Sequence, residues 1–148
     1  MNTGMRRIFL ADDDDDDRQL FQEALAKISD FVNIITFDNG VSLIDQLLKT
    51  HEKLPDAIFL DLNMPLMNGE ECLADIRNES IFAQVPIIIY STSLDRAKVE
   101  YLYEKGANRY LQKPSSFAHL KSALEKCLGY LDNNTGKDGG ILDFVIKY

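Results

Sequence analysis

The sequence has few of the residues on which disulfide-linked and thiolate-metal proteins depend. Its 148 residues include two cysteines, two histidines and no tryptophan. Cys72 and Cys127 stand apart, with no CxxC pair and no Cys/His spacing, which argues against a disulfide framework and a zinc site. Both cysteines fall inside apolar helical patterns, so we predict buried, reduced thiols. His51 and His119 lie in polar surroundings and are expected to face solvent.

The sequence also lacks long apolar runs and an excess of positive charge. Runs such as Ile87–Tyr90 are far shorter than the roughly 20 residues of a membrane span, and no apolar signal-peptide core follows the N-terminal MNTGMRR. Acidic residues outnumber basic ones 24 to 16, which leaves a net charge of −8. Nucleic acids and anionic membranes need clustered Lys and Arg, so we expect a cytoplasmic protein that binds neither.

Short apolar segments alternate with helical patterns along most of the chain. Three of these segments are uninterrupted apolar runs, which is typical of strands that are covered by helices on both faces. The alternation predicts an α/β domain with three layers, in which a doubly wound, five-stranded parallel sheet lies between helices. The predicted strands are Arg7–Ala11, Asn33–Phe37, Ala57–Leu60, Ile87–Tyr90 and Arg109–Gln112.

Apolar residues recur at helical spacing between and after these strands. Ser116 is placed to cap the last helix at its N-terminus, and Gly106 to end the helix that precedes the fifth strand. The clearest stripes are Leu20, Phe21, Ala24, Leu25 and Ile28, and then Val41, Ile44, Leu47 and Leu48.

The composition changes beyond the last helical stripe. Residues 132–140, with the sequence DNNTGKDGG, are typical of a flexible polar linker. Apolar residues then occupy alternate positions of 141–148, which predicts a half-buried strand. We therefore divide the chain into a domain at 1–131 and a linker and tail at 132–148, and we hypothesise that the tail docks as an extra strand on this or a neighbouring subunit.

Chemically active side chains follow four of the five predicted strands. A run of aspartates that begins with Asp12 and Asp13 follows the first strand, and Asp61 follows the third. Ser91 follows the fourth strand and Lys113 the fifth. Because parallel strands end at one rim of their sheet, and ligands bind there, we expect these side chains to converge.

Carboxylates that converge need a compensating charge. At about 4 Å, two of them repel by on the order of 4 kcal/mol at an effective dielectric constant near 20. Raised pKa values or a bound cation would offset this repulsion, and a few carboxylates completed by water and phosphate oxygens favour Mg²⁺. Lys113 cannot bind a metal while charged, but it can contact an anion beside one. Metal, lysine and the Ser91 hydroxyl together would neutralise a phosphoryl group.

The sequence resembles the receiver domains of two-component response regulators over roughly residues 6–131. The matching motifs, in chain order, are IFLADD at 8–13, FLDLNMPLMNG at 59–69, IIYST at 88–92 and GANRYLQKP at 106–114. The resemblance implies a flavodoxin-like fold with the strand order 2-1-3-4-5. It also implies a stand-alone response regulator, because the residues after 131 are too few for an output domain.

The resemblance assigns a role to each residue at the rim. Asp61 would accept a phosphoryl group from a phosphohistidine of a sensor histidine kinase or phosphotransfer protein. The same Asp61 would bind Mg²⁺ with Asp13 directly, Asp12 mainly through water, and the backbone carbonyl of Asn63. Lys113 would contact both Asp61 and a phosphate oxygen.

The resemblance also implies how the signal leaves the site. Ser91 would hydrogen-bond the phosphoryl group, Tyr110 would reorient with it, and Pro114 would follow a cis peptide bond. The output would be a protein–protein interaction with an unknown downstream protein, or onward phosphotransfer. Apart from the resemblance, our hypothesis for the tail adds that its docking links phosphorylation to a homodimer. Such a protein is no enzyme beyond its own autophosphorylation and autodephosphorylation.

Other interpretations explain less of the pattern. Asp15–Asp17 fit the acidic first turn of a helix and need no further role. A calcium loop would need glycine where Asp17 stands. A phosphatase or phosphotransferase with an aspartyl nucleophile would want a second carboxylate at position 63, which is Asn63. An adaptor independent of phosphorylation would need none of the rim residues.

Overall fold

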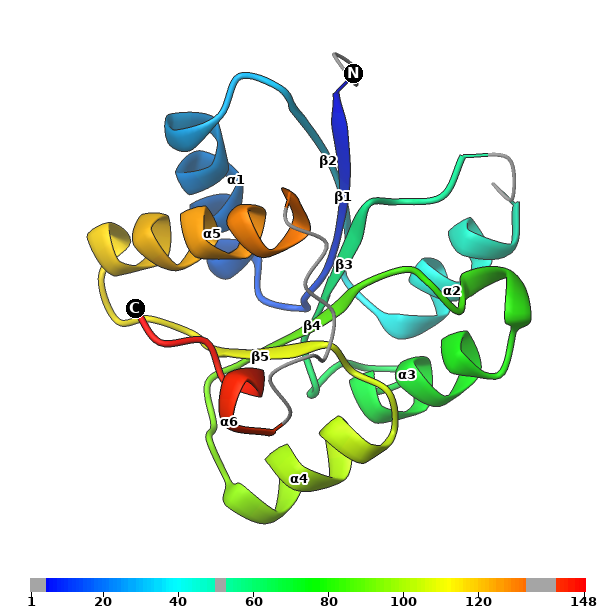
Figure 1. Ribbon diagram of the computed structural model, residues 1–148. Coiled ribbons are helices and arrows are strands. Elements are labelled where there is room, and N and C mark those ends of the chain that lie inside the picture. The colour runs from blue at the N-terminus through cyan, green and yellow to red at the C-terminus, as the bar shows by residue number, and fades with distance from the viewer. Residues whose placement is uncertain (1–4, 50–52, 133–140) are drawn as a thin grey trace.

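Five parallel strands form the centre of the computed structural model, which describes residues 5–49, 53–132 and 141–148. The strands are β1 (Arg6–Ala11), β2 (Val32–Phe37), β3 (Ala57–Leu60), β4 (Ile87–Ser91) and β5 (Arg109–Gln112). They lie in the order β2-β1-β3-β4-β5, and every neighbouring pair is parallel (Figure 1). This order confirms the predicted flavodoxin-like topology.

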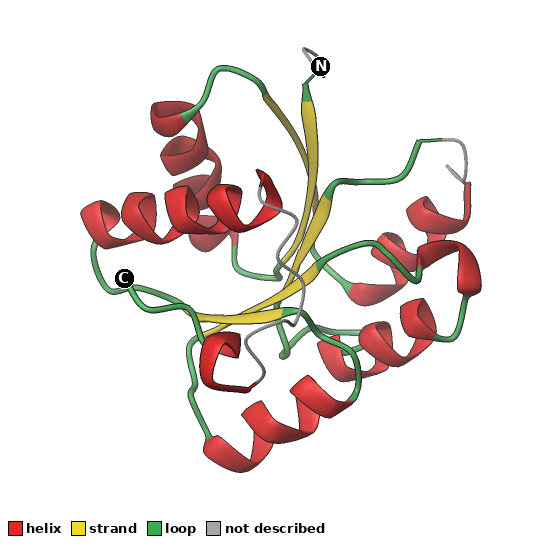
Figure 2. Ribbon diagram, viewed as in Figure 1, coloured by secondary structure: helices red, strands yellow, loops and turns green. Residues whose placement is uncertain are grey.

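Helices cover both faces of this sheet, as the secondary-structure colouring shows (Figure 2). They are α1 (Asp15–Ile28), α2 (Gly40–Lys49), α3 (Gly69–Arg77), the 3₁₀ turn η1 (Ser80–Phe82), α4 (Arg96–Glu104), α5 (Phe117–Asp132) and the short α6 (Ile141–Phe144). One apolar core lies between the sheet and α1 and α5, and a second between the sheet and α2, α3 and α4. The three predicted layers are therefore confirmed.

Strand β1 shows why the predicted strands are continuous apolar runs. Ile8 and Leu10 belong to the core under α1 and α5, whereas Phe9 and Ala11 belong to the core on the opposite face. All four side chains are fully buried. Since successive side chains of a strand point to opposite faces, a strand between two helical layers needs an apolar residue at every position.

The predicted helix ends at Ser116 and Gly106 are confirmed. The backbone N–H of His119 donates to the Ser116 hydroxyl at 3.1 Å, which caps α5. Gly106 has a φ of 107°, and its N–H donates to the Tyr103 carbonyl at 3.3 Å. The next N–H, of Ala107, returns to Leu102 at 3.1 Å, so α4 ends in the paired hydrogen bonds of a Schellman motif.

The predicted inner faces of two helices are partly wrong. In α2 the buried side chains are Leu43 and Leu47, whereas Val41 and Leu48 are 46% and 47% exposed. In α1 the exposed member of the predicted stripe is Leu20. The apolar side chains of residues 41–48 fit two overlapping apolar faces of a helix. The spacing alone therefore did not decide which face packs on the sheet.

The tail forms a helical turn where we predicted a strand. Residues 141–144 are α6, and only Val145 makes a parallel bridge, with Tyr110 of β5. The alternating burial is nevertheless present further along, because Phe144 and Ile146 are buried against the domain. Eight residues are too few for an alternating pattern to exclude a turn of helix at one end. Residues 133–140 of the predicted linker lie outside the described residues.

Other expectations concern single side chains and membrane spans. Cys72 and Cys127 are both buried, as predicted, and His119 is exposed. His51 lies outside the described residues. Among the helices in the described ranges, none is long and apolar enough to cross a bilayer.

Candidate functional site

The loops that follow β1 and β3 place two buried aspartates side by side. Ala11 and Leu60 are register partners in the sheet, so Asp12 and Asp61 are the next residues on adjacent strands. The Asp61 N–H donates to the Ala11 carbonyl at 2.9 Å, which continues the ladder to the rim. Asp12 is fully buried and Asp61 is 5% exposed, although neither lies in an apolar pattern. Two carboxylates that are this far from water require a nearby positive charge.

A third carboxylate completes the cluster from the solvent side. Asp13 is exposed, and oxygen atoms of Asp12, Asp13 and Asp61 lie within 4.8 Å of one another. Burial, and then the negative charge of Asp12, raise the pKa of Asp61 from 3.8 to about 6, against the opposing charge of Lys113. The cluster therefore has the oxygen donors and the excess negative charge that a hard divalent cation satisfies. An open side remains for water or a ligand.

Asn63 lies two residues after Asp61 in the loop between β3 and α3, and it is exposed. Its backbone carbonyl as a metal ligand stays a prediction. The start of the same loop is held by the Leu62 N–H, which donates to Asp61 Oδ1 at 2.8 Å. This hydrogen bond fixes one carboxylate oxygen and leaves Oδ2 toward Lys113.

Gly69 explains how helix α3 can begin so close to Asp61. A Cβ atom at this position would lie 2.2 Å from the Asp61 carbonyl oxygen and 2.8 Å from Leu62 Cα. No side chain fits there without moving the backbone of the Asp61 loop. The N–H of Gly69 donates to the Leu62 carbonyl at 3.0 Å, so the tight approach also closes the loop.

Lys113 brings the compensating charge from the end of β5. Its Nζ lies 2.7 Å from Asp12 Oδ2, 2.8 Å from Asp17 Oδ2 and 3.5 Å from Asp61 Oδ2. The backbone N–H of Lys113 donates to the Ser91 carbonyl at 2.7 Å, which anchors the residue at the rim. Burial alone lowers the pKa of Lys113, but its contacts with Asp12 and Asp17 and the charge of Asp61 outweigh burial and raise it. The lysine is therefore charged.

Asp17 is a member of the site that the sequence interpretation missed. We assigned it only to the acidic start of a helix, yet its carboxylate accepts a hydrogen bond from Lys113. Asp14 caps α1 by accepting from the Asp17 N–H at 3.0 Å, which makes Asp17 the third residue of the first turn. The turn is fastened to the rim by Arg18, which donates to the Asp12 carbonyl at 2.7 Å. If Asp14 had been recognised as the N-cap of α1, Asp17 would have been placed in the first turn, beside the end of β1.

Ser91 lies at the same rim, at the end of β4, and is fully buried. Its Oγ lies 3.3 Å from the Ser93 Oγ and accepts from the Ser93 N–H at the same distance. The backbone of Ser91 is thus joined to Lys113 and its hydroxyl to Ser93. A contact of this hydroxyl with a phosphoryl group stays a prediction.

Tyr110 connects the loop after β4 to the tail. The side chain is fully buried, and its hydroxyl donates to the Ser93 carbonyl at 2.6 Å. The ring of Phe144 packs edge-on against it, with centroids 6.2 Å apart. The Ile146 N–H donates to the Tyr110 carbonyl at 2.8 Å. Figure 1 shows α6 beside β5 and α4, where these contacts are made.

The cis peptide bond predicted before Pro114 is wrong, because the Lys113–Pro114 bond is trans. Trans is favoured over cis by only about 0.5–1 kcal/mol at X–Pro bonds, so the sequence does not fix the isomer. The predicted position of Lys113 does not depend on it, since the Lys113 N–H is held by Ser91.

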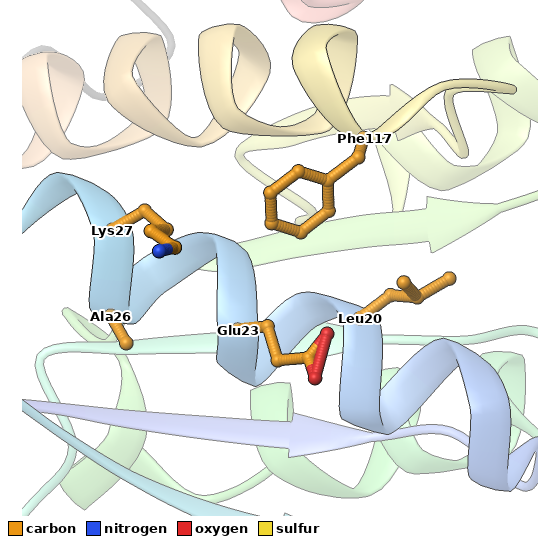
Figure 3. Close-up of a pocket in the computed structure, with 5 residues that line it drawn as sticks. All are labelled: Leu20, Glu23, Ala26, Lys27 and Phe117. Carbon is orange, nitrogen blue, oxygen red and sulfur yellow. The ribbon is translucent and has the colours of Figure 1, made fainter.

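A mostly apolar groove runs between α1 and α5, apart from the carboxylate cluster (Figure 3). The ring of Phe117 projects from α5 toward α1, and Leu20 and Glu23 line the opposite side. This position explains why Leu20 is exposed. With one carboxylate and one ammonium group, from Glu23 and Lys27, the groove lacks the converging charges of the rim.

The comparisons with known proteins agree with this fold. The family model of the response regulator receiver domain matches residues 8–125. The chemotaxis protein CheY1 of Helicobacter pylori is 28% identical over 126 residues, which are 85% of this chain and 99% of that protein.

Two solved structures are similar in both fold and sequence. The phosphorylated cyanobacterial phytochrome response regulator RcpA matches with a TM-score of 0.81 and 26% identity, over 89% of this chain and 97% of that one. The Mn(2+)-bound form of response regulator Rcp1 matches with a TM-score of 0.75 and 28% identity, over 84% of this chain and 93% of that one.

Proposed function

The chain belongs to the response regulator receiver domain family, and we propose that it accepts a phosphoryl group on Asp61 in a reaction that needs Mg²⁺. The family is one of signalling proteins. The observation that carries the proposal is the position of Asp61 beside the ammonium group of Lys113 and the carboxylates of Asp12 and Asp13. Lys113 Nζ lies 3.5 Å from its Oδ2, and oxygens of Asp12 and Asp13 lie within 4.8 Å.

Asp12, Asp13 and Asp61 would hold the Mg²⁺ ion, with the Asn63 carbonyl as a further ligand. The bound ion would offset the charge of the carboxylates and of the incoming phosphate. Two observations support this, one on the chain and one on a similar protein. The three carboxylates offer oxygen donors on a side that is open to solvent, and a similar response regulator has been solved in a Mn(2+)-bound form.

The donor in this proposal is a phosphohistidine of a sensor histidine kinase or a phosphotransfer protein. One relative of the chain, a protein of Helicobacter pylori, is itself named a sensor histidine kinase, CheAY. An Asp61 oxygen attacks phosphorus as the P–N bond breaks, and the departing imidazole nitrogen takes that bond's electron pair and a proton from solvent. Asp61 must be ionised, which its pKa of about 6 allows at neutral pH. Lys113 then moves onto a phosphoryl oxygen.

The output is a change in protein–protein contacts in the cytoplasm, with catalysis limited to the chain's own phosphorylation and dephosphorylation. Ser91 would turn its hydroxyl toward the phosphoryl group. Tyr110 would then reorient, because both side chains contact Ser93 in the loop after β4. The hydrogen bond from the Tyr110 hydroxyl to Ser93 supports this route, because Ser93 also contacts the Ser91 hydroxyl. The downstream partner would bind the surface around α4, β5 and α5.

The tail is placed to bias Tyr110. Phe144 and Ile146 are buried on this subunit, and they contact the Tyr110 ring and carbonyl. Docking of the tail therefore favours the buried orientation of Tyr110. If phosphorylation favours the same orientation, the tail and the phosphoryl group stabilise each other, since coupling between two sites is reciprocal. Exchange of tails between two copies would give the hypothesised homodimer, and light scattering before and after phosphorylation tests that.

Incubation with acetyl phosphate and Mg²⁺ tests the proposal. We expect the intact mass to rise by one phosphoryl group per chain, with no rise in the Asp61→Asn variant or in the presence of a chelator. A chain that stays unmodified contradicts the proposal. Continuous hydrolysis of simple phosphoesters would instead favour an enzyme with an aspartyl nucleophile.

A further inference from the structure

We propose that Asp17 is a positioning residue that holds Lys113 beside the first turn of α1 until a phosphoryl group displaces it. Lys113 Nζ is 2.8 Å from Asp17 and 3.5 Å from Asp61. The inference rests on the proposed function, in which Lys113 contacts the phosphoryl group. It adds that the lysine must first leave a carboxylate that takes no part in metal binding or phosphoryl transfer.

Asp17 is the partner that can release Lys113 most easily. Asp12, the other close carboxylate, is fully buried at the end of β1. Its Oδ1 accepts from the Asp14 N–H at 3.0 Å, and its carbonyl accepts from Arg18, so its position is fixed. The Asp17 side chain is 31% exposed and lies on the first turn of a surface helix. It can rotate into water, where a free carboxylate is well solvated.

Asp17 opposes entry of the phosphoryl group in two ways. Its negative charge repels an anionic donor, and its ion pair occupies the ammonium group that would otherwise attract that donor. Asparagine at position 17 would retain a polar side chain of the same size but exert neither effect. Removal of the charge should therefore strengthen binding of the donor rather than weaken it.

Asp16 provides the matched control. It lies on the same first turn, is exposed, and also contributes one negative charge near the N-terminus of α1. Asp16→Asn thus removes the same formal charge and the same favourable interaction with the helix dipole. Any difference between the two variants reports the position of the Asp17 charge beside Lys113 rather than net charge or helix stability.

The experiment measures the rate of phosphorylation of the full chain against acetyl phosphate concentration, at saturating Mg²⁺, by intact mass. We expect Asp17→Asn to lower the half-saturating donor concentration by about threefold to fivefold, the scale of one partly exposed ion pair. Asp16→Asn should change the half-saturating donor concentration by less than about half the factor expected for Asp17→Asn. Asp17→Glu, which can restore the pair, should resemble the wild type, and Asp17→Ser should resemble Asp17→Asn.

The outcomes separate this inference from the proposed function. Equal half-saturating concentrations for Asp17→Asn and Asp16→Asn, or a higher value for Asp17→Asn, would overturn the role of Asp17 and leave Asp61 as the acceptor. A wild-type chain that is never phosphorylated overturns both. Melting temperatures of all variants are measured alongside, and Asp17→Ser serves if Asp17→Asn does not fold.

Discussion

Lys113 and Asp12 form the closest ion pair of the site, with 2.7 Å between Nζ and Oδ2, in a place where neither side chain is more than 9% exposed. Asp61, the proposed acceptor, lies 0.8 Å further from the same ammonium group, at 3.5 Å against 2.7 Å. In this arrangement the lysine neutralises the neighbours of Asp61 more than Asp61 itself. Asp61 is therefore a buried carboxylate whose charge Lys113 offsets only in part, which leaves a need for a further cation.

Mg²⁺ should stabilise the fold through the carboxylate cluster. Binding to the folded chain alone adds about 2.7 kcal/mol at a concentration of 100 times Kd, so the melting temperature should rise with Mg²⁺. Asp13→Asn should remove most of this rise, because Asp13 contributes its oxygen from the exposed side of the cluster without supporting the core. Asp16→Asn is the control and should keep the rise. Equal Mg²⁺ responses in both variants would contradict the predicted site.

Asp61 should make the metal-free protein less stable as the pH rises. Its pKa is about 6 in the folded chain against 3.8 in the reference state, so the folded chain holds this proton more tightly. The stability that follows is present below about pH 3.8 and is lost as the pH rises to about 6, with a total near 3 kcal/mol.

The measurement is the free energy of unfolding in chelator for the wild type and for Asp61→Asn, across this pH range. The wild type should lose stability relative to the variant as the pH increases. A difference that does not change with pH, or that changes in the opposite direction, would show that Asp61 is not strained by Asp12 and burial.

Sequence reasoning located the rim because strand ends in a parallel sheet are fixed by the fold. Asp12, Asp61 and Lys113 each follow a predicted strand directly, so an error of one residue in a strand boundary hardly moves them. Asp17 was missed because its position depends on where α1 begins, and six consecutive aspartates offer several equivalent caps. Asp14 is the one that accepts from a backbone N–H three residues later.

The tail was misjudged for a different reason. Phe144 of the tail packs against Tyr103 and Tyr110, which are distant in the chain, and a pattern of eight residues does not contain them. The apolar alternation correctly indicated burial of Phe144 and Ile146 but not the backbone conformation of α6. Burial of Phe144 and Ile146 follows from their apolar side chains. Whether the tail forms a helix or a strand depends on the surface of the domain on which it packs.

Phe144 should anchor the tail. The side chain is fully buried between the rings of Tyr103 and Tyr110, so Phe144→Ala should destabilise the chain by about 3 kcal/mol or more. Tyr148→Ala, in the same tail at a residue that is 42% exposed, is the control and should cost far less. Chemical denaturation measures both. If the Phe144 variant is as stable as the Tyr148 variant, the tail is not docked in solution.

The same pair of variants tests the coupling to Tyr110. We expect the phosphorylated Phe144→Ala chain to lose its phosphoryl group faster than the wild type, because the tail no longer favours the buried orientation of Tyr110. Lifetimes are followed by intact mass after the donor is removed. An unchanged lifetime together with lower stability would leave the tail as a structural element without influence on the site.

The two thiols should be inert in the folded chain. Burial is the main cause that raises the pKa of Cys72 and of Cys127 to about 12. At pH 8 almost no thiolate is present, so a disulfide reagent such as DTNB should react only after denaturation. Rapid reaction of either cysteine in the native protein would show that its part of the core opens.

Reduction of the phosphorylated chain with borohydride tests the central claim most directly. An aspartyl phosphate is an acyl phosphate, and borohydride converts it to homoserine, which tandem mass spectrometry locates in the sequence. Our account predicts homoserine at position 61 only, and only after treatment with donor and Mg²⁺. Homoserine at position 12, 13 or 17, or a phosphorylated chain that contains none, would contradict it.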